Sequence, residues 1–171
     1  PKKYIDYEEL EKSKQALSES KDAAKKLRPT HEQIMQAKAD YRRFCNESNR
    51  KKLVFYSEKS GFYKYYKDII EYIIEHSDIT IHYITSDPID AIFTKNNRQI
   101  VPYYIDDNRL ITLFMKMDAD IVVMTTPDLQ NFHLKRSYVR KNIEYVYLFH
   151  GLASTHLVAR KGAFDHFDTL L

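Results

Sequence analysis

The sequence predicts an α/β protein with a doubly wound, mostly parallel sheet that is preceded by an α-helical hairpin. Three observations predict this class. From residue 52 onward, short apolar runs alternate with helical stretches, which is typical of βαβ units. The apolar runs are nearly continuous, as expected for strands that are buried on both faces. Residues 4–27, in contrast, contain good helix formers and no glycine or proline.

The first 50 residues are predicted to form the hairpin as a domain of its own, with residues 51–171 as the second domain. A seven-residue repeat marks the first helix: Leu10, Leu17 and Ala24. Thr30 and Gln33 have the spacing of a capping box, and apolar residues follow at helical spacing: Ile34, Ala37, Tyr41 and Phe44. Because these stripes are narrow, we expect the hairpin to pack on the following domain, on a second copy in a homodimer, or on a segment outside the chain.

The second domain is predicted to contain five strands and two helices. We expect strands at 53–56, 79–84, 100–105, 121–124 and 145–149, and helices at 62–75 and 108–117. In the first of these helices one face is apolar: Tyr66, Ile69, Ile70 and Ile73. Pro102 lacks a backbone donor, so the strand at 100–105 is predicted to lie at an edge of the sheet.

Right-handed crossovers bring the carboxyl ends of parallel strands to one edge of the sheet. Four loops with hydroxyls, a carboxylate or a helix start follow predicted strands: 57–61, 85–88, 125–128 and 150–151. We therefore expect them to converge on one crevice.

His150 is the main candidate for chemistry, because an imidazole where a buried strand gives way to a loop can transfer protons to a ligand. A histidine that is satisfied by backbone hydrogen bonds is the structural alternative. Gly151 favours the functional interpretation, since a glycine after the strand lets backbone approach a ligand closely.

The other candidates are hydroxyls, cations and one helix start. Ser60 and Gly61 precede a helix whose first N–H groups can bind an anion, although Ser60 as a simple N-cap is at least as good an interpretation. Further candidate substrate-binding residues lie in the other loops: Ser86, Asp87, Thr125, Thr126, Ser154, Arg160 and Lys161. No dinucleotide fingerprint or P-loop motif is present, which disfavours those cofactors in this segment.

Several other groups have simpler structural interpretations. His82 within a strand, His76 at a helix end and Cys45 as a small packing residue need no function. The basic cluster at 133–141 is interpreted by default as a solvated face. No spacing among the histidines and carboxylates matches a standard metal site.

The charge distribution is asymmetric. Residues 1–52 contain 14 Lys and Arg against 9 Asp and Glu, whereas the rest contains 13 against 15. This basic segment is compatible with contact to an anionic membrane surface, but nothing indicates nucleic-acid binding. No apolar stretch reaches the ~18 to 20 residues that span a bilayer. Both ends look cut, so we expect an anchor or second domain outside the 171 residues.

A family resemblance adds a specific reaction. Residues 145–151 (YVYLFHG) with 164–168 (FDHFD) downstream resemble the CDP-glycerol glycerophosphotransferase family, which primes or polymerises wall teichoic acid in Gram-positive bacteria. The likeness extends through 53–58, 63–76 and 82–88, and it covers roughly residues 50–171. Phe149 stands where the family often has tryptophan, and Thr155 and His156 stand where it has lysine.

The resemblance implies a Rossmann-like, acceptor-side domain that forms the N-terminal half of a GT-B fold, with the donor-binding half beyond Leu171. His150 would be the base that activates an acceptor hydroxyl for attack on CDP-glycerol, and Gly151 would give the substrate room. The resemblance leaves open whether the transfer requires a divalent cation. The partners would be a nucleotide-activated polyol and a polyol-phosphate or lipid-linked acceptor, and the location the cytoplasmic face of the membrane.

Three other functions stay open at this point. The chain could be a non-catalytic oligomerisation module, a GT-B glycosyltransferase domain with another nucleotide-activated donor, or a flavodoxin-like regulatory domain. The identity of the acceptor and polymer is not contained in these residues.

Overall fold

The computed structural model describes residues 29–47, 51–151 and 159–171. Its helices are α2 (His31–Asn46), α3 (Tyr63–His76) and α4 (Asp107–Met115), with short 3₁₀ helices η1 (Ser60–Phe62) and η2 (Ala91–Thr94). The strands are β1 (Lys51–Ser57), β2 (Ile81–Thr85), β3 (Ile100–Tyr104), β4 (Ala119–Met124), β5 (Glu144–Tyr147) and β6 (Thr169–Leu170). The predicted helix at 4–27 lies outside the described residues.

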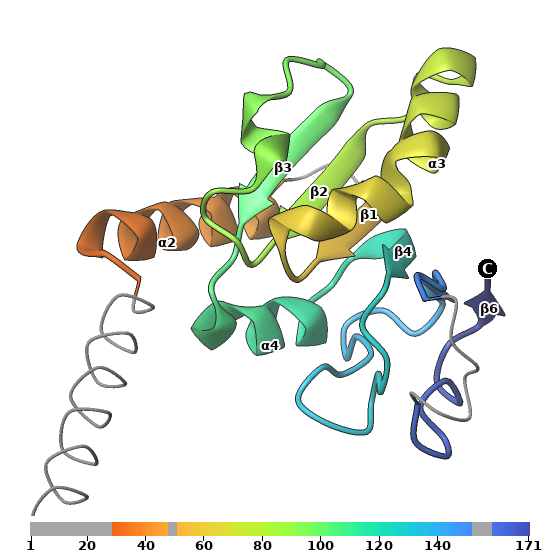
Figure 1. Cartoon of the computed structure of the whole chain (residues 1–171). Coiled ribbons are helices and arrows are strands. Elements are labelled where there is room, and N and C mark those ends of the chain that lie inside the picture. The colour runs from red at the N-terminus through yellow and green to blue at the C-terminus, as the bar shows by residue number, and fades with distance from the viewer. Residues whose placement is uncertain (1–28, 48–50, 152–158) are drawn as a thin grey trace, which may run out of the picture. The chain divides into compact units, whose positions relative to one another are not determined.

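All six strands pair in parallel in the order β3-β2-β1-β4-β5-β6 (Figure 1). This order belongs to doubly wound, Rossmann-like sheets, and the predicted fold class is confirmed. The chain runs outward from β1 to β3 and then returns to β4 on the other side of β1. The pair β1 and β4 is therefore the switch point of the topology.

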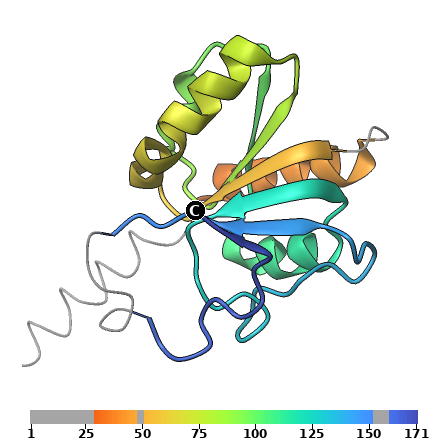
Figure 2. The ribbon, with the colours of Figure 1, turned by 90° about the vertical axis from the view of Figure 1, so that its right-hand side faces the viewer.

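Helices lie on both faces of the sheet (Figure 2). Alternate residues of β1 face opposite ways: Leu53 and Phe55 pack in the core under α3, and Val54 and Tyr56 pack in the core on the side of α2 and α4. This two-sided burial explains why the strands are continuous apolar runs. The predicted face of α3 is confirmed, with Tyr66 and Ile70 fully buried.

Two features of α2 follow the sequence prediction and one does not. The Thr30 N–H donates to Gln33 Oε1 (2.8 Å) and the Gln33 N–H donates to Thr30 Oγ1 (3.2 Å), so the capping box is confirmed. Ala37 and Phe44 are buried. Cys45 is exposed, and the interpretation as a packing residue is wrong because it lies on the solvent side of the helix.

The structure divides the chain into two units, Pro1–Ile34 and Met35–Leu171. The unit that holds the sheet therefore includes α2 from Met35 onward, whereas the predicted boundary was at residue 50. Phe44 joins the core on the side of β2 and β3, where its ring meets Tyr103 edge-on (centroids 5.1 Å apart). The second hairpin helix thus packs on the following domain, which was one of the expected arrangements.

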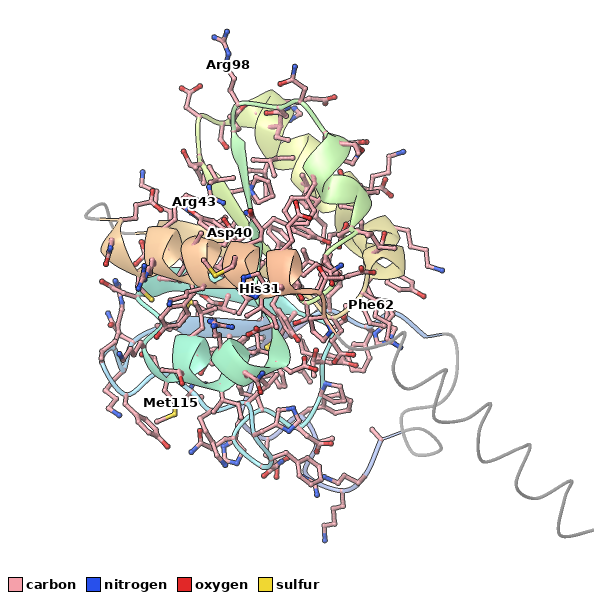
Figure 3. The ribbon with its side chains drawn as sticks, turned by 90° about the vertical axis from the view of Figure 1, so that its left-hand side faces the viewer. His31, Asp40, Arg43, Phe62, Arg98 and Met115 are labelled. Atoms are coloured by element: carbon pink, nitrogen blue, oxygen red, sulfur yellow. The ribbon has the colours of Figure 1, made fainter. Side chains whose placement is uncertain are left out.

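The outer edge of β3 is covered by an ion pair from α2. Asp40, only 3% exposed, accepts from the backbone N–H of Tyr104 (3.0 Å) and from Arg43 (2.8 Å). Arg43 in turn donates to the carbonyl of Pro102. Figure 3 labels both side chains on α2. Pro102 does lie on an edge strand, as predicted, and α2 satisfies the edge groups that a further strand would otherwise pair.

The long connection between β4 and β5 contains no helix. Arg136 donates to the carbonyls of His166 (2.8 Å) and Ile143 (3.0 Å), and Arg140 pairs with Asp118 (3.1 Å) and Asp120 (2.6 Å). The interpretation of this cluster as a solvated face is therefore wrong for both arginines, which tie the connection to the sheet.

The sixth strand, β6, was not predicted, because two paired residues are too short for a periodicity signal. None of the helices in the described part of the chain is long and apolar enough to cross a bilayer.

Candidate functional site

The carboxyl edge of the sheet carries all four loops that the sequence singled out. Because of the strand order, the loops that follow β2, β1, β4 and β5 lie next to one another in that sequence along the edge. The structure thus brings Ser86 and Asp87, Ser60 and Gly61, Thr125 and Thr126, and His150 and Gly151 to one side of the molecule.

A buried tyrosine occupies the switch point itself. The Tyr66 hydroxyl donates to the carbonyl of Tyr56 in β1 (2.6 Å), and its oxygen also lies within hydrogen-bond distance of Thr125 Oγ1 after β4 (3.2 Å). Burial raises the pKa of Tyr66 well above its usual value, so its hydroxyl stays protonated and remains a donor. Thr125 is therefore engaged in a structural bond across β1 and β4, at the point where doubly wound folds usually hold a ligand.

Ser86 has a similar engagement. Its Oγ lies 3.3 Å from the Tyr56 hydroxyl, and burial raises the pKa of Tyr56 as it does that of Tyr66. The hydroxyl groups of two predicted site residues, Thr125 and Ser86, therefore contact buried tyrosines.

The carboxylate of Asp87 lies at the helix start of Ser60 and Gly61, where the sequence predicted that an anionic substrate binds. Its Oδ2 accepts from the backbone N–H of Ser60 (3.2 Å) and its Oδ1 from that of Ile89 (3.0 Å). Ser60 Oγ accepts from the N–H of Ala91 (3.3 Å), so it links two loops and does not cap the helix. An internal carboxylate therefore satisfies the first N–H of this segment, and an external anion would compete with it.

Gly61 is exposed, and a Cβ at this position would meet no atom within 4 Å. Its φ angle lies outside the positive range. The packing around it therefore does not demand glycine.

Thr126 differs from Thr125, because its Oγ1 is enclosed and finds no hydrogen-bond partner within the described part of the chain. The chain then turns at Asp128, whose φ of 64° is unusual for a residue with a side chain. Arg160 donates to the Asp128 carboxylate (2.6 Å) and its guanidinium lies 4.0 Å from the centre of the Phe132 ring. Lys161 is exposed, and Ser154 lies outside the described residues.

His150 lies at the end of the row, after β5. The N–H of Leu148 still donates to Met124 in β4 (2.9 Å) and that of Phe149 to Leu171 (2.8 Å), so the backbone remains part of the sheet until one residue before the histidine. The imidazole is flanked by Phe62 (5.5 Å) and Tyr65 (5.1 Å), measured between ring centroids. His150 as a whole is half-buried, but its Nδ1 is enclosed and has no hydrogen-bond partner among the described residues.

Phe62 and Tyr65 are site residues that the sequence interpretation missed. Both come from the aromatic run at 62–66, of which only Tyr66 was assigned, to the apolar face of a helix. The sequence did contain a signal for them: four of the five residues at 62–66 are aromatic, which is more than one buried helix face needs. Which ring would meet His150 depended on the strand order, which the sequence does not contain.

Among the described residues, no three side chains of His, Cys, Asp or Glu lie close enough together to hold a metal ion. Comparison of the chain with protein-family models, with curated proteins and with solved structures finds no significant match.

Proposed function

We propose that this chain is the acceptor-side domain, the N-terminal half of a GT-B fold, of an enzyme that transfers glycerol phosphate from CDP-glycerol to an acceptor hydroxyl. The observation that carries the proposal is the position of His150, in the loop that follows β5 at the carboxyl edge of a parallel sheet, with Gly151 next to it. Ligands of doubly wound sheets bind at this edge. The resemblance of residues 145–151 to the glycerophosphotransferase family supplies the reaction class.

In the proposed step, His150 accepts the proton of the acceptor hydroxyl while that oxygen attacks the β-phosphorus of CDP-glycerol. The new oxygen–phosphorus bond forms as the bond to the bridging oxygen breaks, and CMP leaves with that oxygen. The product is a phosphodiester between acceptor and glycerol, as in a teichoic acid or a related cell-wall polymer. An imidazole suits this role because histidine exchanges protons near neutral pH.

Cations and partners complete the proposal. Lys161 is exposed on the segment that follows β5 and is placed to attract phosphate, whereas Arg160 would first have to leave Asp128. The acceptor is a polyol phosphate or a lipid-linked polyol, and the donor is held by a second domain outside these residues. The basic residues at 1–52 favour peripheral contact with the anionic cytoplasmic face of the membrane.

The test is a transfer assay on the full-length gene product with radiolabelled CDP-glycerol and a polyol-phosphate acceptor. His150→Ala should lower kcat by about 100-fold or more, the usual contribution of a positioned base, with an unchanged circular dichroism spectrum. His76→Ala is the matched control, since His76 is exposed at the far end of α3. Normal transfer by His150→Ala, or no use of CDP-glycerol by the wild type, would refute the proposal.

The same preparation separates the alternatives. Transfer from another nucleotide-activated sugar or polyol would indicate a different donor. Loss of a homodimer on removal of residues 1–28, which leaves α2 in place, with no effect of His150→Ala in any transfer assay, would favour an oligomerisation module.

A further inference from the structure

The enclosed Nδ1 of His150 requires a physical explanation. A buried polar atom without a partner loses its hydrogen bonds to water and gains nothing in return, which is unfavourable in a folded protein. Thr126 Oγ1, at the end of the neighbouring strand, is enclosed and unpartnered as well. Two such atoms therefore lie close together in the chain order of the carboxyl edge, one after β4 and one after β5.

The cover over His150 comes from the start of α3. Phe62 belongs to η1 and Tyr65 to the first turn of α3, and both are only half-buried. Their rings are tilted by 51° and 55° to the imidazole and lie against it without a hydrogen bond. Figure 3 labels Phe62 where the chain enters α3.

This cover is less deeply buried than the helix residue that follows it: Phe62 and Tyr63 pack against the core under α3 but stay partly exposed, and the Tyr63 ring lies 6.0 Å from that of Tyr83. Neither η1 nor α3 has a side-chain N-cap, and two long hydrogen bonds join η1 to the next loop: Ser60 N–H to Asp87 (3.2 Å) and Ala91 N–H to Ser60 Oγ (3.3 Å). One residue further, Tyr66 is fully buried and bonded across the sheet. Segments with few buried contacts open at lower free energy than the core.

We propose that residues 60–65 form a lid over His150, latched by Ser60 and Asp87 and hinged before Tyr66. Opening moves Phe62 and Tyr65 off the imidazole and exposes Nδ1, and the exposed Gly61 lets the backbone bend without a clash. The role of the lid in admitting an acceptor hydroxyl to His150 rests on the proposed function. The opening itself does not.

The test measures opening in the full chain without substrate. Asp87→Ala removes the acceptor of the Ser60 N–H, and Ser60→Ala removes the acceptor of the Ala91 N–H with less disturbance. We expect amide hydrogen exchange at 62–65 and carbethoxylation of His150 to rise together, by about tenfold in Asp87→Ala, because one hydrogen bond of this kind shifts a local equilibrium by that order. Exchange in β1 should stay at the wild-type rate.

Ser77→Ala is the matched control, because Ser77 Oγ donates to the Ile73 carbonyl (2.7 Å) at the other end of the same helix. Equal acceleration of His150 modification in this variant would overturn the lid, as would wild-type rates at 62–65 or at His150 in both latch variants. If the lid opens as expected but the full-length protein transfers nothing from CDP-glycerol, the proposed function fails and the lid stands.

Discussion

At the scale of single residues, the hydroxyl groups of two buried tyrosines make hydrogen bonds that connect the loops at the carboxyl edge of the sheet. Tyr66 joins β1 to the loop after β4 through two bonds, and Tyr56 reaches Ser86. Tyrosine is already protonated at physiological pH, and burial raises the pKa of both side chains further. The edge is therefore braced by neutral hydrogen bonds that do not change between pH 5 and 8.

Removal of one such hydroxyl tests this bracing. Tyr66→Phe should lower the free energy of unfolding by about 1–2 kcal/mol, because the Tyr56 carbonyl loses its donor and the buried Thr125 hydroxyl loses a hydrogen-bond partner. Urea denaturation measures the change. Tyr72→Phe on the same helix, where the side chain is 64% exposed, is the control and should change stability by less than about 0.5 kcal/mol.

Two glycines give a second residue-scale prediction. Gly162 has a φ of +83° and a Cβ there would lie 3.2 Å from Asp165 Oδ2, whereas Gly61 has neither restriction. Gly162→Ala should destabilise the protein by about 1–2 kcal/mol, and Gly61→Ala should have little effect. Thermal unfolding of the two variants side by side measures the difference. Equal losses would show that backbone conformation is not what selects glycine at 162.

At the scale of elements, α2 covers the outer edge of β3, where a seventh strand would otherwise pair. Asp40 and Arg43 satisfy an N–H and a carbonyl of the β3 edge, and they are paired with each other (2.8 Å). A covered edge of this kind prevents pairing with another chain.

Loss of the carboxylate should uncover this edge. Asp40→Ala leaves the buried N–H of Tyr104 and one side of Arg43 without an acceptor, and we expect a loss of about 2 kcal/mol in urea denaturation. Lys38→Ala, at an exposed position of the same helix, should leave stability within about 0.5 kcal/mol of the wild type. A loss that is no larger in Asp40→Ala than in Lys38→Ala would mean that α2 does not hold the edge.

At the scale of the whole molecule, a buried histidine makes stability depend on pH. His82 Nδ1 lies 3.1 Å from the Tyr103 hydroxyl, which donates to Glu47 (3.0 Å), and 3.5 Å from Glu47 itself. Burial lowers the pKa of His82, Glu47 opposes this shift, and Lys51 and Arg43 add to it. The same groups, Arg43 and Glu47 with Tyr103, line a surface cavity of about 460 Å³ between α2 and β3.

The sign of the pH effect follows from this shift. The unfolded chain binds a proton at His82 near pH 6.5, before the folded protein does, so stability is full above about pH 6.5 and falls as the pH drops toward the folded pKa. Urea denaturation between pH 5 and 8 should therefore show a steeper acid loss in the wild type than in His82→Gln. Glu47→Gln should lower the pKa of His82 further in an NMR titration. Identical pH profiles for the wild type and His82→Gln would refute the assignment.

The sequence by itself determined the local features of this protein. Continuous apolar runs specified buried strands, Pro102 specified an edge, and Thr30 with Gln33 specified the start of α2, because each signal lies within a few residues of the structure that it produces. The set of loops at the carboxyl edge also followed, since parallel strands with right-handed crossovers leave no other arrangement.

The tertiary structure alone decided which side chains meet. The pairing of β1 with β4 joins residues more than 60 positions apart throughout its register, and it is selected by how the layers pack rather than by any local pattern. That pairing sets Tyr66 against Thr125. Together with the pairing of β5 to β4 it brings Phe62 and Tyr65 against His150, and the pairing of β2 to β1 brings Asp87 against Ser60. Periodicity assigns a residue to a face, but only the packed layers determine what that residue contacts.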